Sequence, residues 1–330
     1  MDRDNMDQKK RRLAVRNIFL KREISILGAA VLLFFGLSLA TPHFLRIDNL
    51  LLVARQISIL AIIAIGMTFL FIAREIDLSV GSMYGFLVVV LAFLISRTTL
   101  DPWVAMGVVI IAGASLGLLN GLLTTLFGMP SFIVTLGMLS ILRGSSLLLT
   151  GGWPIIIRTS EDHSFLNFTA GYAGGVVPTQ IFWMISLMLI GGFFLGKTRF
   201  GAHVYATGGN EEAARLSGIP VKRVKTVCFM ITGALCGIAA ALLLGQVRSG
   251  FPLTGAGFEL DIIAAVVIGG TPLFGGRGSI LGTLLGASIT GMITNGLVLL
   301  GASAYFEPVA KGSIIIIAVL INTLTRRKYA

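Results

Sequence analysis

The stretch Leu50–Ala73 reads LLLVARQISILAIIAIGMTFLFIA and contains one charged side chain, Arg55. A helix needs about 20 predominantly apolar residues to cross the hydrocarbon core of a bilayer, so this stretch predicts a transmembrane helix. Similar apolar runs, separated by charged or turn-forming residues, give ten candidate spans: 24–41, 50–73, 80–96, 102–125, 131–149, 180–196, 224–244, 260–274, 280–300 and 312–325. The third, eighth and tenth are short enough for one of them to be re-entrant.

The composition agrees with this interpretation along the whole chain. Of the 330 residues, 55% are hydrophobic and only 12% are charged, whereas a soluble domain has about 25% charged residues. The 41 glycines fit membrane helices, in which small residues let two backbones approach closely. We predict an all-α polytopic protein of about ten transmembrane helices. These helices form a single transmembrane domain that is surrounded by membrane lipid.

Basic residues gather in three places, and the chain carries a formal net charge of +11. Of the 26 Lys and Arg residues, eight lie in 3–22, six in 197–225 and three in 326–328. Basic clusters beside spans mark cytoplasmic segments, and an even number of spans separates each cluster from the next. We therefore expect both termini and the 197–225 loop in the cytoplasm, and no nucleic-acid binding. The predicted organisation is a basic N-terminal segment 1–23, a transmembrane domain 24–325 and a tail 326–330.

A short sequence echo suggests internal symmetry. Glu75-Ile76-Asp77-Leu78 follows the second span, and Glu259-Leu260-Asp261-Ile262 follows the seventh. Because an odd number of crossings separates the motifs, they are expected on opposite membrane faces, as in two five-helix halves of inverted topology. We interpret the acidic residues of both motifs as structural groups that cap helices or brace the halves; substrate contact is the alternative.

The sequence contains no pattern typical of catalysis or metal binding. Gly270–Gly275 has the glycine spacing of a phosphate-binding loop, but Gly276 stands where the lysine is required. His43, His163 and His203 are far apart and form no metal motif. No acidic residue lies in the middle of a span, where a proton-coupled carrier keeps its carboxylate. We predict no catalytic residue, no cofactor and no metal site.

Polar side chains within the spans are costly against lipid and are expected to face the protein interior or a solute pathway. The candidates for the pathway are Asn120, Thr135, Gln246 and Asn295. Two arginines also interrupt apolar runs. Arg55 is near a span end and can extend to the interface. Arg143 lies deeper, and we expect it to serve helix packing rather than substrate contact.

The segment Gly208–Pro220, GGNEEAARLSGIP, predicts a two-turn helix in the cytoplasmic loop. Asn210 is a good N-cap. Glu211 and Glu212 complement the positive helix N-terminus, and Arg215 lies nearer the negative end. Two turns are too short for a helix that is stable alone in water. The segment is therefore either a loop packed on its own protein or a helix held in a partner's groove.

Together these residues resemble the ribose-type permease family of ATP-binding-cassette importers. The matching stretches are Ile76–Ser82 (IDLSVGS), Pro130–Gly137 (PSFIVTLG), Arg143-Gly144, Gly208–Gly218 (GGNEEAARLSG) and Glu259–Gly278 (ELDIIAAVVIGGTPLFGGRG). Positions in these stretches that we take as a structural motif are Asp77, Ser79, Gly81, Glu259, Asp261, Gly269 and Gly270. The sequence departs from the family at Arg74-Glu75, where many members have two glycines.

The resemblance implies a permease subunit of the bacterial cytoplasmic membrane, not an enzyme, that forms the translocation pathway for a monosaccharide. The implied partners are two cytoplasmic ATP-binding subunits, a periplasmic or lipid-anchored sugar-binding protein, and a second permease subunit in a homodimer or heterodimer. The segment implied to dock on the ATPase comprises Gly209, Asn210, Glu211, Glu212, Ala213, Ala214 and Arg215.

Two other functions stay open at this point. An autonomous, ion-coupled secondary carrier of a small solute is also built from inverted repeats. A membrane scaffold or receptor would move no solute. Reconstitution distinguishes the three, because the importer needs ATP and partners whereas the carrier needs an ion gradient.

Overall fold

The computed structural model describes residues 23–157 and 163–303, with the single residues 306, 308, 309, 312, 313, 316 and 320. Within these residues, eight helices are long and apolar enough to cross a membrane: Glu23–Ala40, α2 (Ile47–Ile72), α3 (Val80–Arg97), α4 (Pro102–Thr125), α5 (Ser131–Thr150), α7 (Thr179–Lys197), α10 (Val221–Val247) and α12 (Ile280–Leu299). The shorter helices are α6 (His163–Ala170), α8 (Arg199–Gly209), α9 (Glu211–Leu216) and α11 (Phe258–Ile268). The predicted all-α polytopic class is confirmed.

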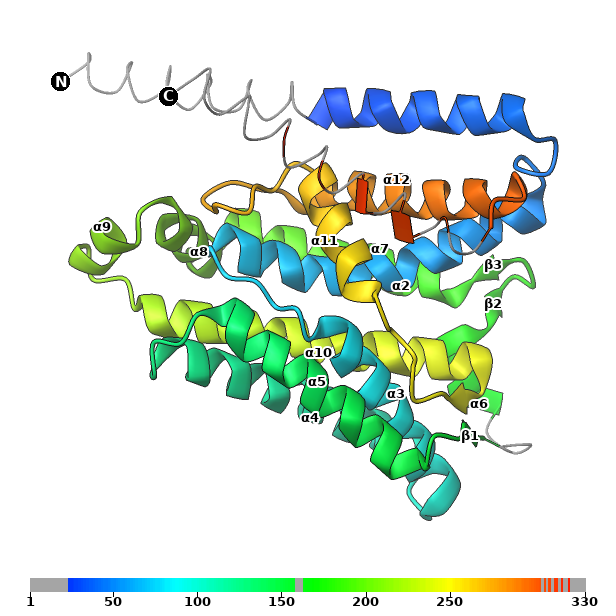
Figure 1. Cartoon of the computed structure of the whole chain (residues 1–330), viewed down its shortest axis with the longest axis horizontal. Helices are drawn as coiled ribbons and strands as arrows, with labels where there is room; N and C mark the ends of the chain where they lie inside the picture. Colours follow the sequence, from blue (N-terminus) through cyan, green and yellow to red (C-terminus); the bar gives the residue numbers. More distant parts are fainter. Residues whose placement is uncertain are drawn as a thin grey trace.

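Short strands and short helices mark the two ends of the bundle. The strand β1 (Ile155–Ile156) pairs antiparallel with β4 (Ser249–Gly250), and β2 (Tyr172–Ala173) pairs antiparallel with β3 (Val177–Pro178). These strands lie with α6 at one end of the long helices, and α8 and α9 lie at the other (Figure 1). We refer to them as the α6 end and the α9 end.

The eighth predicted span, 260–274, is wrong as a full crossing. Helix α11 has 11 residues, or about 16 Å of rise, which is roughly half of the hydrocarbon core. The helix ends before Gly269, and Gly270 follows with a φ of +90°. Glycine enters this left-handed conformation without strain, and Pro272 cannot continue a helix, so the chain turns. The tenth predicted span, 312–325, lies largely outside the described residues.

Two non-helical segments enter the bundle from opposite ends. Residues 73–79 lead inward from the α9 end to the start of α3, and residues 248–257 lead inward from the α6 end to the start of α11 (Figure 1). The acidic motifs found in the sequence lie in the first segment and at the start of α11. Opposite entry is the arrangement that the inverted-repeat hypothesis predicts, and segments of this kind leave backbone groups that other elements must satisfy.

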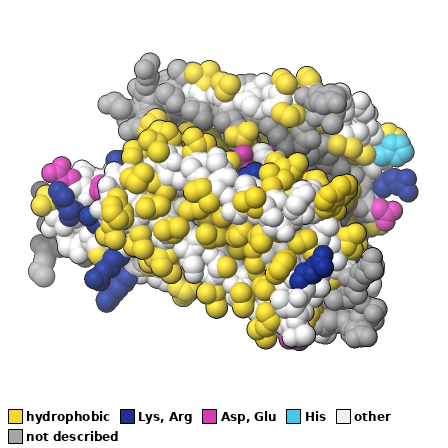
Figure 2. Space-filling view, turned by 60° about the horizontal axis from the view of Figure 1, so that its bottom comes forward, with side chains coloured by type: hydrophobic (Ala, Val, Ile, Leu, Met, Phe, Trp, Pro, Cys, Tyr) yellow, Lys and Arg dark blue, Asp and Glu magenta, His cyan; other side chains and the backbone are white. Residues whose placement is uncertain are grey.

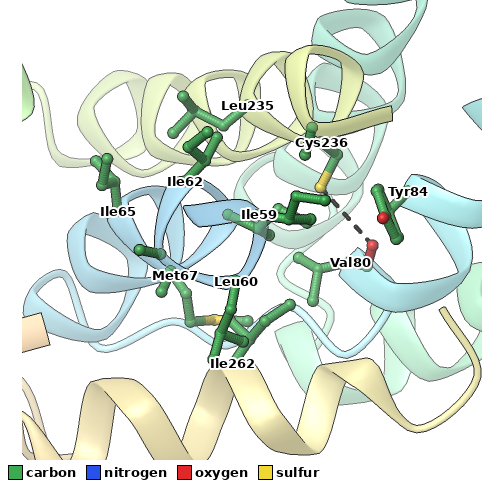
Figure 3. Close-up of a cluster of buried hydrophobic side chains, with 14 of the residues drawn as sticks. Ile59, Leu60, Ile62, Ile65, Met67, Val80, Tyr84, Leu235, Cys236 and Ile262 are labelled. Atoms are coloured by element: carbon green, nitrogen blue, oxygen red, sulfur yellow. Dashed lines mark hydrogen bonds between the residues drawn. The ribbon is translucent and has the colours of Figure 1, made fainter. Parts of the chain in front are cut away.

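Helix α2 is the central helix of the bundle. Its residues are buried without a break from Ile57 to Ile72. Figure 3 shows Ile62 of α2 facing Leu235 of α10, and Leu60 of α2 facing Ile262 of α11. This unbroken burial shows that other helices, rather than lipid, cover α2 along this stretch.

The outer helices present apolar side chains to their surroundings. Figure 2 shows a broad hydrophobic surface, with most of the visible charged side chains toward its left and right ends.

Glycines allow close packing between helices inside the bundle. Helices α4 and α10 form the most extensive helix pair among the described elements. A Cβ added at Gly113 of α4 would overlap the carbonyl of Gly233 of α10. Backbones can approach this closely where neither residue has a side chain.

Candidate functional site

The predicted short helix is present as α9, and its ends follow from the sequence. Asn210 is extended, and its Oδ1 accepts a hydrogen bond from the Ala213 N–H at 3.0 Å, as an N-cap does. At the other end Gly218 has a φ of +81°. Its N–H donates to the Arg215 carbonyl at 3.0 Å, so the helix stops in the left-handed turn that glycine favours.

Most of α9 faces away from the protein. Within this helix Ala214 is buried, whereas Glu211, Glu212, Ala213, Arg215 and Leu216 are exposed. Leu216 is 80% exposed, although apolar residues gain free energy from burial. The helix thus presents charges of both signs beside an uncovered leucine at the tip of the bundle (Figure 1).

An ion-pair cluster fastens α9 to the body of the protein. The Lys225 ammonium of α10 lies 2.8 Å from a Glu211 carboxylate oxygen and 2.7 Å from one of Glu75. The side chains of Lys225 and Glu75 are 11% and 10% exposed, whereas that of Glu211 is 53% exposed. Arg74 adds a hydrogen bond from Nη2 to the Gly209 carbonyl at 2.9 Å. Residues from three separate parts of the sequence therefore meet beneath α9.

Helix α8, which precedes α9, contacts the end of α2 and the loop 269–279. A Cβ at Gly208 would overlap the Ile72 carbonyl, which also accepts a hydrogen bond from the Gly276 N–H at 2.9 Å. The Tyr205 hydroxyl donates to the Gly278 carbonyl at 2.7 Å. Burial, with the Glu23 carboxylate adding to the effect, raises the pKa of Tyr205 to about 12.

A buried polar cluster holds the non-helical segment 73–79. Asp77 Oδ1 accepts hydrogen bonds from the Ser79 N–H at 2.8 Å and from the Ser79 hydroxyl. The Asn120 amide of α4 donates to Asp77 Oδ2 at 3.3 Å and to Ser79 Oγ at 3.0 Å. The Leu78 N–H donates to Thr135 Oγ1 of α5 at 3.0 Å. Buried polar groups need such partners, so the geometry supports a structural role for the cluster.

The predicted pathway residues do not form one group. Asn120 and Thr135 belong to the cluster around segment 73–79, as just described. Asn295 of α12 pairs with Asn49 of α2, with amide-to-oxygen distances of 2.8 and 3.2 Å. Gln246 is half-buried, close to the end of α10. The described residues of one subunit therefore do not bring these four side chains together along a single pathway.

The glycines of the structural motif mark close contacts around α11. On α3, a Cβ at Gly81 would overlap Glu259, and one at Gly85, which is outside the motif, would overlap the Thr254 carbonyl. Gly269 packs in the same way against Gly282 of α12. Within α11 itself, Asp261 is buried and the Glu259 side chain is partly buried. These acidic residues lie in the first turn of α11, where the positive end of the helix dipole favours them.

The two arginines within apolar runs, Arg143 and Arg55, both bond to other parts of the protein. Arg143 of α5 donates from Nη1 to the carbonyls of Pro252 and Thr254, at 3.1 and 2.8 Å, and so holds the second non-helical segment. Arg55 donates to the Tyr172 hydroxyl at 3.1 Å, at the α6 end.

The contacts of Arg74, Glu75 and Lys225 were not expected from the sequence. One signal was available, since Lys225 is a charge just inside the predicted span 224–244.

Asn120→Ala is expected to lower the melting temperature of the purified protein. Asp77 would stay buried while losing a donor, which costs about 1–3 kcal/mol. Ser115→Ala on the same helix is the matched control, because its exposed hydroxyl bonds to the Ile111 carbonyl one turn earlier. If Asn120→Ala leaves the melting temperature unchanged but weakens the apparent affinity for a transported solute, Asn120 lines a pathway instead.

Comparison with known proteins gives matches over most of the chain. The family described as "Branched-chain amino acid transport system / permease component" matches residues 49–324. The chain is 38% identical over 295 residues to the ribose import permease protein RbsC of Haemophilus influenzae, covering 89% of this chain and 91% of the relative. RbsC of Bacillus subtilis is 40% identical over 296 residues, covering 90% and 91%. The L-arabinose ABC transporter permease protein AraH of Azospirillum brasilense is 35% identical over 300 residues, covering 90% and 86%.

Proposed function

We propose, from the premise that this chain belongs to the ribose-type permease family of ATP-binding-cassette importers, that it forms the translocation pathway for a monosaccharide delivered by a binding protein. Membership of this family makes the chain a multi-pass permease of the bacterial inner membrane and a transport subunit rather than an enzyme. Because the relatives' names refer to ribose and to L-arabinose, the proposal extends to the class of monosaccharides and not to one sugar.

The observation that carries the proposal is the exposed, capped helix α9. Residues at both ends cap the helix, and a charge cluster attaches it to α10 and to segment 73–79. The side chain of Leu216 is exposed. We assign residues Gly209–Arg215 to docking on a cytoplasmic ATP-binding subunit at the α9 end. The sugar-binding protein then docks at the α6 end, and a second permease subunit, identical or related, completes the pathway.

Reconstitution of the native complex in proteoliposomes tests this function. The permease, its ATP-binding subunit and its sugar-binding protein should take up labelled ribose or another monosaccharide only when ATP is supplied on the α9 side. The permease alone should take up no sugar under a proton or sodium gradient. Uptake driven by an ion gradient without ATP would identify a secondary carrier, and a complex that moves no member of a monosaccharide panel would contradict the proposal.

The membrane orientation gives a separate prediction. We place the α9 end and both termini in the cytoplasm; the termini themselves lie outside the described residues. Trp153 is 78% exposed at the α6 end, and Arg223 is exposed near α9. A membrane-impermeant maleimide should label Trp153→Cys in intact cells, and Arg223→Cys only after permeabilisation. The natural cysteines, Cys228 and Cys236, are buried and should give a low background. Labelling of Arg223→Cys in intact cells would reverse the orientation.

A further inference from the structure

The backbone at Arg74 is one that ordinarily selects glycine. Arg74 follows the C-cap of α2 with a φ of +63°, and its N–H donates to the Phe71 carbonyl at 3.0 Å. Helices commonly end in such a left-handed residue, and glycine occupies it without strain. An arginine placed there bears a conformational cost that its backbone role does not require. We therefore expect contacts of the Arg74 side chain to offset this conformational cost.

The side chains of Arg74 and Glu75 both reach toward α9. Arg74 donates to the carbonyl of Gly209, the last residue of α8, immediately before the N-cap of α9. Glu75 lies 2.7 Å from Lys225, which in turn lies 2.8 Å from Glu211 in the first turn of α9. Lys225 is thus shared between a nearly buried carboxylate and a half-exposed one.

The other end of the same segment is fixed deep in the bundle. Two residues beyond Glu75, Asp77 is held by Ser79 and by Asn120 of α4. The backbone N–H groups on either side of Asp77 donate to hydroxyls of α5. Residues 73–75 are bonded through their backbone N–H groups to the last turns of α2. Beyond Glu75, the N–H groups of Ile76 and Leu78 bond to side chains of α5, so the position of this part of the segment depends on contacts with other elements.

From these contacts we infer that Arg74, Glu75 and Lys225 are positioning residues that couple displacement of α9 to segment 73–79 and hence to the start of α3. This inference rests on the proposed function, in which α9 receives the ATP-binding subunit. A partner that moves α9 pulls on Glu211 and Gly209, and the buried Lys225–Glu75 pair passes that movement into the membrane core. Without the pair, α9 can still dock while the segment stays where the Asp77 cluster holds it.

The test is the amount of sugar imported per ATP hydrolysed by the full complex in proteoliposomes. Lys225→Met should leave ATP-binding-subunit co-purification and basal ATP hydrolysis close to native, while import per ATP falls by about tenfold or more, within the range of energetic coupling between sites. Lys225→Arg keeps both carboxylate contacts and should restore most of the import. Lys222→Met, exposed one turn earlier on α10, is the control and should behave as native.

A second variant covers the case in which Lys225→Met fails to assemble. Arg74→Gly combined with Glu75→Gln removes the Arg74 hydrogen bond to Gly209 and the charge of the Glu75–Lys225 pair. The introduced glutamine keeps an oxygen that accepts from Lys225 and glycine relieves the left-handed backbone, so the melting temperature should change little. Import per ATP should still fall. Native import per ATP in the double variant would overturn the inference, as would a loss of import in Lys225→Met no larger than its loss of assembled complex. The proposed function fails separately, if the native complex shows no ATP-driven import.

Discussion

Ala214→Pro is expected to abolish ATP-driven sugar import while leaving the transmembrane bundle folded. The Ala214 N–H donates to the Asn210 carbonyl at 2.9 Å and closes the first turn of α9. Proline removes this bond and clashes with the preceding turn, at a cost of about 3 kcal/mol or more. A free-energy change of that size reduces the population of docked helix by more than about a hundredfold. Replacing Glu211 with proline would not disrupt α9, because the first helical position tolerates proline.

The measurement has three parts: import in proteoliposomes, co-purification of the ATP-binding subunit, and the melting temperature of the permease alone. Import and co-purification should be lost together, and the melting temperature should change little, because α9 contributes one buried side chain. Lys222→Ala, on the exposed side of the neighbouring helix, should retain both. Normal ATP-driven import by Ala214→Pro would show that α9 is not the docking helix.

Gly117→Val is expected to prevent assembly of the permease altogether. A Cβ at this position of α4 would overlap the carbonyl of Phe229 in α10. The obstructing atom belongs to helical backbone, which cannot rotate away as a side chain can. Forcing extra atoms into a packed core costs about 1–3 kcal/mol even where side chains can adjust. We expect a larger cost here, comparable to the whole stability of a typical domain.

Gly107→Val is the matched control on the same helix, because a Cβ there meets no other atom within 4 Å. The yield of monodisperse protein in mild detergent and its melting temperature should be close to native for Gly107→Val and near zero for Gly117→Val. A stable Gly117→Val protein would mean that α4 and α10 are further apart than described.

Local sequence signals predicted much of this protein. The apolar runs located the long helices, since a stretch such as Leu50–Ala73 has few alternatives to spanning a bilayer. The ends of α9 followed from Asn210 and Gly218, because capping and left-handed turns depend on residues within one turn of each other. These features need no information from elsewhere in the chain.

What the sequence alone determined is therefore the membrane class, most of the helix positions and the existence of α9. The tertiary structure decided that Asn120 and Thr135 hold segment 73–79 and that Lys225 joins Glu75 to Glu211. Both depend on segments far apart along the chain. In a bilayer nearly every face of a helix is apolar, so hydropathy does not reveal which polar side chain finds which partner. That choice is made by the close approach of backbones at glycines and by the requirement that buried polar groups be paired.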